Sequence, residues 1–202
     1  MSAAPHDELT GPYHYPVPPP EGWVAEDLDR LPDLPRHTEL IDGSLVFMSP
    51  QTRFHMRTMR LLEHCLLDQA PDDLDVFREF SIKLDSRNRP EPDLLVVPSD
   101  ADTGPKETYL RPDDVLLAVE VVSEESEARD RDVKPRKYAT AGVVHFWRVE
   151  RGADGLPVVY VYELDPALRA YTATGIYHNT LKLGVPFPID IDLTAVHRRR
   201  MR

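Results

Sequence analysis

The chain has 202 residues, of which 41% are hydrophobic and 29% charged, and its formal net charge at pH 7 is −11. This composition is that of a globular protein and excludes wholesale disorder, while the single cysteine, Cys65, excludes an internal disulfide framework and a multi-cysteine zinc site. The acidic balance argues against proteins that coat nucleic acid or bind membranes through a basic surface, because both need a positive field. It leaves open an enzyme that contacts DNA through a local basic patch.

The two ends of the chain differ in composition from the middle. Residues 1–21 include the run Pro18-Pro19-Pro20, which predicts an extended proline-rich arm. We expect residues 22–196 to form one domain and residues 197–202 to form a basic tail. No apolar run approaches the roughly 18 residues of a membrane span, and the N-terminus lacks the apolar core of a signal peptide. The sequence therefore predicts a cytoplasmic protein without membrane contact.

The first half of the domain begins with a short amphipathic helix near residues 23–31, which Leu31-Pro32 ends. Residues 39–48 are two apolar runs around Asp42-Gly43, and this pair is typical of a β-hairpin turn because glycine tolerates a positive φ. Residues 53–70 carry apolar side chains at helical spacing and predict a helix.

The second half is dominated by predicted strands. Residues 76–84 alternate apolar and polar side chains, and the continuous apolar runs at 94–97 and 115–122 indicate central strands covered on both faces. A helix is expected over residues 126–141, despite Pro135, and a further buried strand over 143–149. Residues 158–177 predict a late hairpin. The fold class predicted is α/β: a mixed central sheet flanked by helices, with an N-terminal hairpin and a late C-terminal hairpin.

Two acidic residues stand out by their position. Asp93 directly precedes one apolar strand, and Glu120 lies inside another. Burying an unpaired carboxylate costs several kcal/mol, so Glu120 is expected either to pair with a lysine or arginine, to lie at a sheet edge, or to bind a metal. Converging carboxylates without cysteine favour a hard cation such as Mg²⁺ or Mn²⁺ over zinc. Such an ion lowers the pKa of a bound water and neutralises charge on a phosphate.

Several short signatures occur in a fixed order along residues 22–195: Glu39-Leu40-Ile41-Asp42-Gly43, His55, Pro92-Asp93, Glu120-Val121-Val122-Ser123, Asp130, Lys134, Tyr138, Ala141-Gly142-Val143 and Trp147. This ordered set resembles the Uma-type restriction endonuclease family within the PD-(D/E)XK nuclease superfamily. The resemblance implies a restriction-endonuclease-like core and a carboxylate site for Mg²⁺, with Mn²⁺ as an alternative ion. It also implies DNA as the partner.

The resemblance also assigns roles to individual residues. Asp93 matches the acid of the PD pair and Glu120 the acid of the following strand, so both are expected to bind metal. The superfamily lysine two residues after that acid is replaced by Val122. The Uma-type pattern instead has a lysine four residues after an aspartate, which here is Lys134, four residues after Asp130. Residues four apart share a helix face, so Lys134 is expected to act as the catalytic lysine.

Some roles remain open at this stage. Lys137 competes with Lys134, because the residue before Pro135 is biased out of the α conformation. Glu39 either joins the metal shell or pairs at the edge of the hairpin, and the backbone carbonyl of Val121 is expected to be a metal ligand.

The remaining matched residues are expected near the site. His55 is interpreted either as a partly buried core histidine or as a phosphate or water contact close to the metal. Ser123 and Tyr138 are expected to support the site from behind.

These observations favour a Mg²⁺-dependent endonuclease that hydrolyses the phosphodiester bonds of DNA. The alternative is a catalytically inactive nuclease-fold protein that acts as a DNA-binding or protein-interaction module, which the net charge of −11 favours. Because cutting two strands requires two sites, analogy with restriction nucleases predicts a homodimer.

Overall fold

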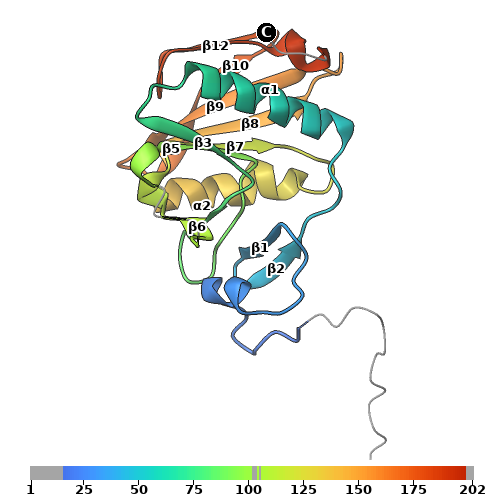
Figure 1. The fold of residues 1–202 in the computed structure, drawn as a ribbon, viewed down its shortest axis with the longest axis vertical. Coiled ribbons are helices and arrows are strands. Elements are labelled where there is room, and N and C mark those ends of the chain that lie inside the picture. Colours follow the sequence, from blue (N-terminus) through green and yellow to red (C-terminus); the bar gives the residue numbers. More distant parts are fainter. Residues whose placement is uncertain (1–15, 102–103, 105, 199–202) are drawn as a thin grey trace, which may run out of the picture.

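A computed structural model describes residues 16–101, 104 and 106–198. Most of the predicted proline-rich arm, residues 1–15, and residues 199–202 of the predicted basic tail lie outside the described residues. Figure 1 shows a central sheet with α1 (Arg53–Gln69) on one side and α2 (Lys134–Ala141) on the other. None of the helices within the described ranges is long and apolar enough to cross a bilayer.

The central sheet has six strands in the order β10-β9-β8-β7-β5-β3, in which only β7 and β8 run parallel. The strands span these residues: β3 Leu74–Arg78, β5 Leu94–Pro98, β7 Leu117–Val121, β8 His145–Arg151, β9 Pro157–Asp165 and β10 Ala170–Tyr177. The predicted central runs at 94–97 and 115–122 are thus the neighbouring strands β5 and β7, and every residue of β7 is buried. The predicted mixed α/β fold is confirmed.

Each face of the sheet builds its own hydrophobic core. On the α1 face, Leu94, Val119 and Val121 pack with Leu62 of the helix. On the α2 face, Leu95 and Ala118 pack with the buried Tyr138. Successive side chains of a strand point to opposite faces of the sheet. Even-numbered residues of β5 and odd-numbered residues of β7 therefore face α1, and the others face α2. Glu120 of β7 is thus on the α2 face.

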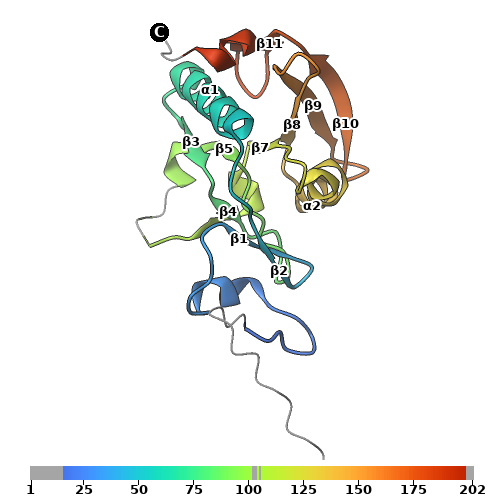
Figure 2. The same cartoon turned by 90° about the vertical axis from the view of Figure 1, so that its right-hand side faces the viewer.

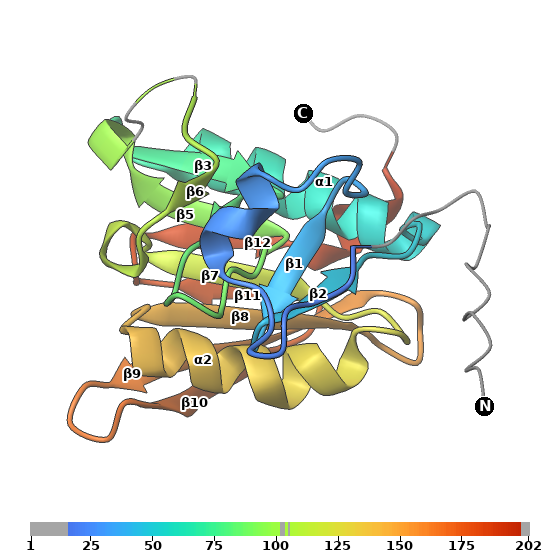
Figure 3. The same cartoon turned by 90° about the horizontal axis from the view of Figure 1, so that it is seen from below.

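The N-terminal segment covers one end of the sheet. A 3₁₀ helix, η1 (Ala25–Asp29), replaces the longer helix expected near residues 23–31. The hairpin β1 (Thr38–Ile41) and β2 (Ser44–Phe47) turns at Asp42-Gly43, where both residues have positive φ, as predicted. Seen from below, this hairpin lies between α1 and α2 (Figure 3).

Two further predicted elements differ from the structure. The strand expected over residues 76–84 is broken at Glu79, whose φ of +50° cannot continue a pleated strand, so β3 ends at Arg78. The chain then forms β4 (Ser81–Ile82), which pairs in parallel with β6 (Tyr109–Leu110) outside the main sheet. The helix expected over 126–141 begins with a π-helical turn, η4 (Arg129–Val133), before α2.

The C-terminal part adds one hairpin that the sequence did not indicate. The predicted late hairpin is β9 and β10, and β11 (Thr180–Leu183) then pairs with β12 (Ile189–Asp192). The buried side chains of this second pair join the α1 core, followed by the 3₁₀ helix η5 (Leu193–His197). Figure 2 shows this segment beside α1 and away from α2.

Candidate active site

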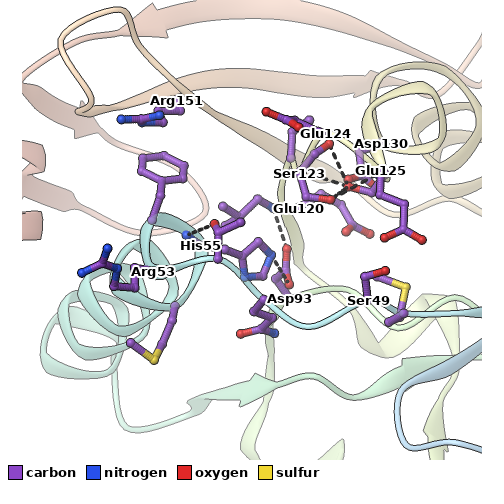
Figure 4. Close-up of a pocket in the computed structure, with 18 of the residues that line it drawn as sticks. Ser49, Arg53, His55, Asp93, Glu120, Ser123, Glu124, Glu125, Asp130 and Arg151 are labelled. Atoms are coloured by element: carbon purple, nitrogen blue, oxygen red, sulfur yellow. Dashed lines mark hydrogen bonds and ion pairs between the residues drawn. The ribbon is translucent and has the colours of Figure 1, made fainter.

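Asp93 and Glu120 lie side by side at the junction of β5 and β7. The antiparallel ladder between these strands ends at Leu94 and Val119, so Asp93 and Glu120 are the next residues on each strand at the same end of the ladder. Glu120 is bonded from the α2 side, by Lys134 and Tyr138, and Asp93 from the α1 side, by His55. The backbone N–H of Val121 donates to Asp93 Oδ2 at 2.6 Å and ties the two strands together at this point. Figure 4 shows both carboxylates in the same pocket.

A buried lysine lies against Glu120. Lys134 Nζ is 2.9 Å from Glu39 Oε1, 3.1 Å from Glu120 Oε2 and 3.3 Å from Asp130 Oδ1. All of these side chains are at most 3% exposed. We call Glu39, Glu120, Asp130 and Lys134 the ionic cluster. Its three carboxylates surround one ammonium, so it carries surplus negative charge when all groups are ionised.

The π turn explains how Asp130 and Lys134 reach the same point. Pro135 has no N–H and its ring would clash with the carbonyl four residues earlier. Widening the preceding turn avoids this clash, and the Lys134 N–H bonds to Arg129 O in the π pattern. Lys134 keeps helical φ and ψ angles although it precedes proline. Wide turns of this kind are frequent at functional sites.

Glu39 reaches the cluster because the N-terminal hairpin docks onto the segment before β5. Leu40 and Arg89 form an isolated β-bridge, with backbone bonds of 3.0 and 2.8 Å. The neighbouring Glu91 N–H donates to Glu39 Oε1 at 2.8 Å. Glu39 thus pairs with the buried Lys134 and not with a residue at the edge of the hairpin.

Burial and mutual repulsion shift the ionisation of the cluster. Burial raises the pKa of Glu120 well above its ordinary value, and Asp130, Asp93 and Glu39 raise it further against the opposing effect of Lys134. Burial likewise raises the pKa of Asp130. Burial alone would lower the pKa of Lys134, but the surrounding carboxylates outweigh it and hold that pKa well above its ordinary value. Lys134 is therefore an ammonium at neutral pH.

The chemistry of these donors fits a hard divalent cation. Glu39 Oε2 is buried and has no hydrogen-bond partner among the described residues, and Asp130 Oδ1 is buried 3.3 Å from the Lys134 ammonium. Within those residues no group of three or more His, Cys, Asp or Glu side chains is already gathered around one point. Mg²⁺ needs no such group, because it is usually held by one or two carboxylates together with water and substrate phosphates. Asp93 and Glu120 supply two adjacent carboxylates.

His55 and Tyr138 orient the two acids. His55 Nε2 lies 3.1 Å from Asp93 Oδ1, and Thr52 caps the helix there by accepting from His55 N. Burial would lower the pKa of His55, but the hydrogen bond to Asp93 outweighs it and the net shift is upward. Tyr138 Oη donates to Glu120 Oε1 at 2.6 Å. Each of the two side chains therefore contacts one of the two acids.

Other predicted residues take different positions. Ser123 bonds to a neighbouring serine: its hydroxyl lies 2.9 Å from Ser126 Oγ and shapes the loop after β7. Lys137, the competing lysine, extends away from the ionic cluster and bonds to Asp42 Oδ1 at 2.5 Å in the hairpin turn. The structure thus brings Lys134, and not Lys137, to Glu120.

A cleft of about 1100 Å³ opens beside these residues. His55, Asp93, Glu120, Val121 and Asp130 line it, whereas Lys134 and Glu39 are not among its lining residues. Lys134 therefore lies behind the wall of the cleft, and the Glu120 carboxylate lies between its ammonium and the cleft. The sequence predicted a lysine near the acids but not this placement.

Asp130 and the arginines of the cleft are functional candidates that the sequence does not mark directly. The spacing of four residues between Asp130 and Lys134 is the one signal for Asp130, because it places both side chains on one helix face. The cleft also contains Arg53, Arg57, Arg129 and Arg151, which come from distant parts of the chain. No local pattern in the sequence marks them as neighbours.

Comparisons with known proteins give a family and a fold. The Uma2 family model, described as "Putative restriction endonuclease", matches residues 25–195. A solved structure, described as "a putative nuclease belonging to DUF820" from Anabaena variabilis ATCC 29413, is similar with a TM-score of 0.61 and 13% sequence identity, over 81% of this chain and 89% of that chain. No curated protein matches. At this identity, the structural likeness shows a shared fold.

Proposed function

The chain belongs to the Uma2 family of restriction-endonuclease-like proteins, and from that premise we propose that it is a Mg²⁺-dependent endonuclease that hydrolyses phosphodiester bonds of DNA. One observation carries the proposal: Asp93 and Glu120 are adjacent on the wall of an open cleft, and a buried lysine holds Glu120 from behind. A protein that used the fold only for packing would have no need for surplus carboxylates beneath a cleft.

Asp93 and Glu120 are the residues that would hold the metal, together with the backbone carbonyl of Val121. Mn²⁺ has similar ligand preferences and is the alternative ion. When bound, the ion supplies a bound water of lowered pKa and neutralises charge on the phosphate. The carboxylates of Asp93 and Glu120 are fixed by the Val121 N–H and by Tyr138, respectively, so that they stay in place as ligands.

Lys134 acts in this proposal as a positioning residue. Its ammonium binds Glu120 and, through Glu39 and Asp130, is itself fixed from two other elements of the chain. A permanent positive charge behind Glu120 favours the carboxylate form that a metal needs. His55 holds Asp93 in a comparable way from α1.

The shape of the cleft suits a polymeric substrate. Its volume of about 1100 Å³ exceeds what one phosphate group occupies, and it is lined by both polar and charged side chains. Cleavage of both strands of a duplex needs two such sites, which supports a homodimer as the active form.

A plasmid-cleavage assay tests the proposal. Purified protein is incubated with supercoiled DNA and Mg²⁺ or Mn²⁺, and nicked and linear products are measured. We expect wild type to cleave and Asp93→Asn to lose cleavage while retaining its circular dichroism spectrum. Cleavage by Asp93→Asn at the wild-type rate would overturn the metal assignment, and no cleavage by wild type with either ion or with single-stranded DNA would overturn the activity.

Two lysine variants separate the candidate lysines. Lys134→Met is expected to weaken Mn²⁺ binding in calorimetry and to reduce turnover, whereas Lys137→Met should leave both unchanged because Lys137 pairs with the hairpin turn. Lys134→Arg retains the charge and should restore part of the metal affinity. Equal metal affinities in Lys134→Met and wild type would contradict the positioning role.

A further inference from the structure

Four arginines line the cleft without a carboxylate partner among the described residues: Arg53, Arg57, Arg129 and Arg151. A fifth arginine of the cleft, Arg78, pairs with Glu63 and Glu79. Unpaired arginines also occur outside the cleft, but the four in it come from three separate elements, α1, η4 and β8, and line one concave surface. Arginines that gather in one cleft without acidic partners, in a chain with 35 acidic residues against 24 basic ones, indicate a binding surface for an anion from outside.

Three of these arginines form one side of the cleft, which we call the basic wall: Arg53, Arg57 and Arg151. Arg53 and Arg57 lie four residues apart near the start of α1, so their Cβ atoms are about 6 Å apart on one helix face. Arg151 ends β8. Figure 4 places Arg53 and Arg151 on the same side of His55 and Asp93.

The opposite side of the cleft is acidic. Glu124 and Glu125 are exposed on the loop after β7 and have no ion-pair partner in the described part of the chain. In Figure 4 they lie across Asp93 from the basic wall. The basic wall therefore attracts a phosphate backbone on the side of α1, whereas Glu124 and Glu125 repel it on the side of the 122–126 loop.

We propose that the basic wall binds the backbone phosphates of the DNA strand on one side of the scissile phosphate, while Glu124 and Glu125 keep the backbone off the other side. Arginine suits this role because its guanidinium donates two parallel hydrogen bonds to a phosphate. The inference rests on the proposed function for the position of the scissile phosphate. It also explains how a chain with a net charge of −11 binds DNA, since the positive field is confined to one wall.

Binding in the absence of metal tests the basic wall independently of cleavage. The probe is a short fluorescein-labelled DNA duplex, titrated with full-length protein in EDTA at several salt concentrations and followed by anisotropy. We expect the triple variant Arg53→Gln/Arg57→Gln/Arg151→Gln to raise Kd at least tenfold at low salt. Each lost phosphate contact should make the slope of log K against log salt shallower by about 0.9, so the triple variant should lose roughly 2 to 3.

Two control variants make the test specific. Arg136→Gln removes the same charge from an exposed position on α2, outside the cleft, and its Kd should stay within about twofold of wild type at salt concentrations of about 0.1 M and above, where charges are screened over about 10 Å. Glu124→Gln/Glu125→Gln should tighten binding. An unchanged Kd and salt slope in the triple variant, or a loss as large in Arg136→Gln, overturns the proposal, as does the absence of duplex binding by wild type at low salt.

The outcomes separate this inference from the proposed activity. If the triple variant loses binding but wild type never cleaves with Mg²⁺ or Mn²⁺, the basic wall stands and the nuclease proposal falls. If Asp93→Asn abolishes cleavage while the triple variant binds and cleaves with an unchanged KM, the nuclease proposal stands and the basic wall falls.

Discussion

Two buried cations in this protein have opposite surroundings. Arg89 and Lys134 are 3% and 1% exposed, and both bind carboxylates. Arg89 meets one carboxylate, Asp29, through both terminal nitrogens, at 2.8 and 3.0 Å. Lys134 meets three carboxylates from three separate elements.

The charge of Arg89 is matched by one carboxylate, although its Nε is buried and has no hydrogen-bond partner among the described residues. Its remaining terminal N–H groups donate to the carbonyls of Ala25 and Thr108, and its guanidinium lies 4.9 Å from the centroid of the Tyr109 ring. These contacts join η1, β6 and the segment before β5, and none of the residues lines the cleft. Arg89 therefore stabilises the N-terminal segment on the domain.

The environment of Lys134 is unbalanced. Three carboxylates share one ammonium, Glu39 Oε2 has no hydrogen-bond partner among the described residues, and Asp93 adds a further negative charge beside Glu120. Surplus buried charge lowers stability, because each unpaired carboxylate has lost its hydration. The comparison teaches how to distinguish the two buried cations. Arg89, whose positive charge is matched by one carboxylate, is structural. Lys134, which is surrounded by more negative charges than it can neutralise, belongs to the proposed functional site.

The largest expected difference between the two regions is in catalysis. Glu120→Gln removes the charge that a metal ligand needs and should lower the cleavage rate by about 10³-fold, as for loss of a central electrostatic group. Asp29→Asn, the same change beside Arg89, should leave turnover per folded molecule within about twofold. Initial rates of plasmid cleavage measure both. An equal loss of cleavage rate in Glu120→Gln and Asp29→Asn would contradict the assignment of different roles to the surroundings of Lys134 and Arg89.

A second difference is in stability. Arg89→Ala leaves Asp29 without its partner and opens the contacts to Ala25 and Thr108, so the free energy of unfolding should fall by about 3 kcal/mol. Urea titration followed by circular dichroism measures this change. Arg136→Ala, which removes an exposed pair with Asp132, is the control and should change stability by less than about 0.5 kcal/mol. A small effect at Arg89 would show that its network is dispensable.

Replacing an acid by its amide should change the free energy of unfolding in opposite directions beside Lys134 and beside Arg89. Asp130→Asn removes one of the surplus charges around Lys134 and should raise the unfolding free energy of the metal-free protein by about 1 kcal/mol, as often seen when functional strain is removed. Asp29→Asn removes a matched charge and should lower it. Thermal melts in EDTA compare the two variants. Destabilisation by Asp130→Asn would mean that the ionic cluster is balanced after all.

The smallest expected effect is a dependence on pH. Burial would raise the pKa of Asp29, but the hydrogen bonds from Arg89 outweigh it and hold that pKa below its ordinary value. The folded state thus favours the carboxylate, so its contribution to stability is present above the unfolded pKa of about 3.9 and is lost as the pH falls through the lower folded value. The difference in stability between wild type and Asp29→Asn should therefore shrink below about pH 4. A constant difference across pH would argue against the pair with Arg89.

The fold could largely be predicted because hydrophobic periodicity is a local property. The apolar runs of β5 and β7, the Asp42-Gly43 turn and α1 were all visible in the sequence. The break at Glu79 was not visible, because a non-glycine residue with positive φ looks like any other residue in an alternating pattern. The β11–β12 pair was missed because its four-residue strands carry few apolar side chains.

Site residues could be predicted from the sequence only where a charged residue interrupts an apolar pattern or matches the family motif. Glu120 was conspicuous as an acid within a buried strand, and family resemblance pointed to Lys134. The partnership of Glu39 with Lys134 depends on how the hairpin docks, which local sequence does not encode. The basic wall was invisible for the same reason: whether an arginine is paired depends on the tertiary structure and not on its neighbours in sequence.

The central claim is that Asp93 and Glu120 together hold a divalent metal on the wall of the cleft. Crystals of the protein soaked in MnCl₂ and measured for anomalous scattering test it most directly. The account predicts a manganese peak about 2.1 Å from carboxylate oxygens of both residues, a typical distance for such ions. An occupied manganese site elsewhere, with these two carboxylates bound only to protein groups, would contradict it.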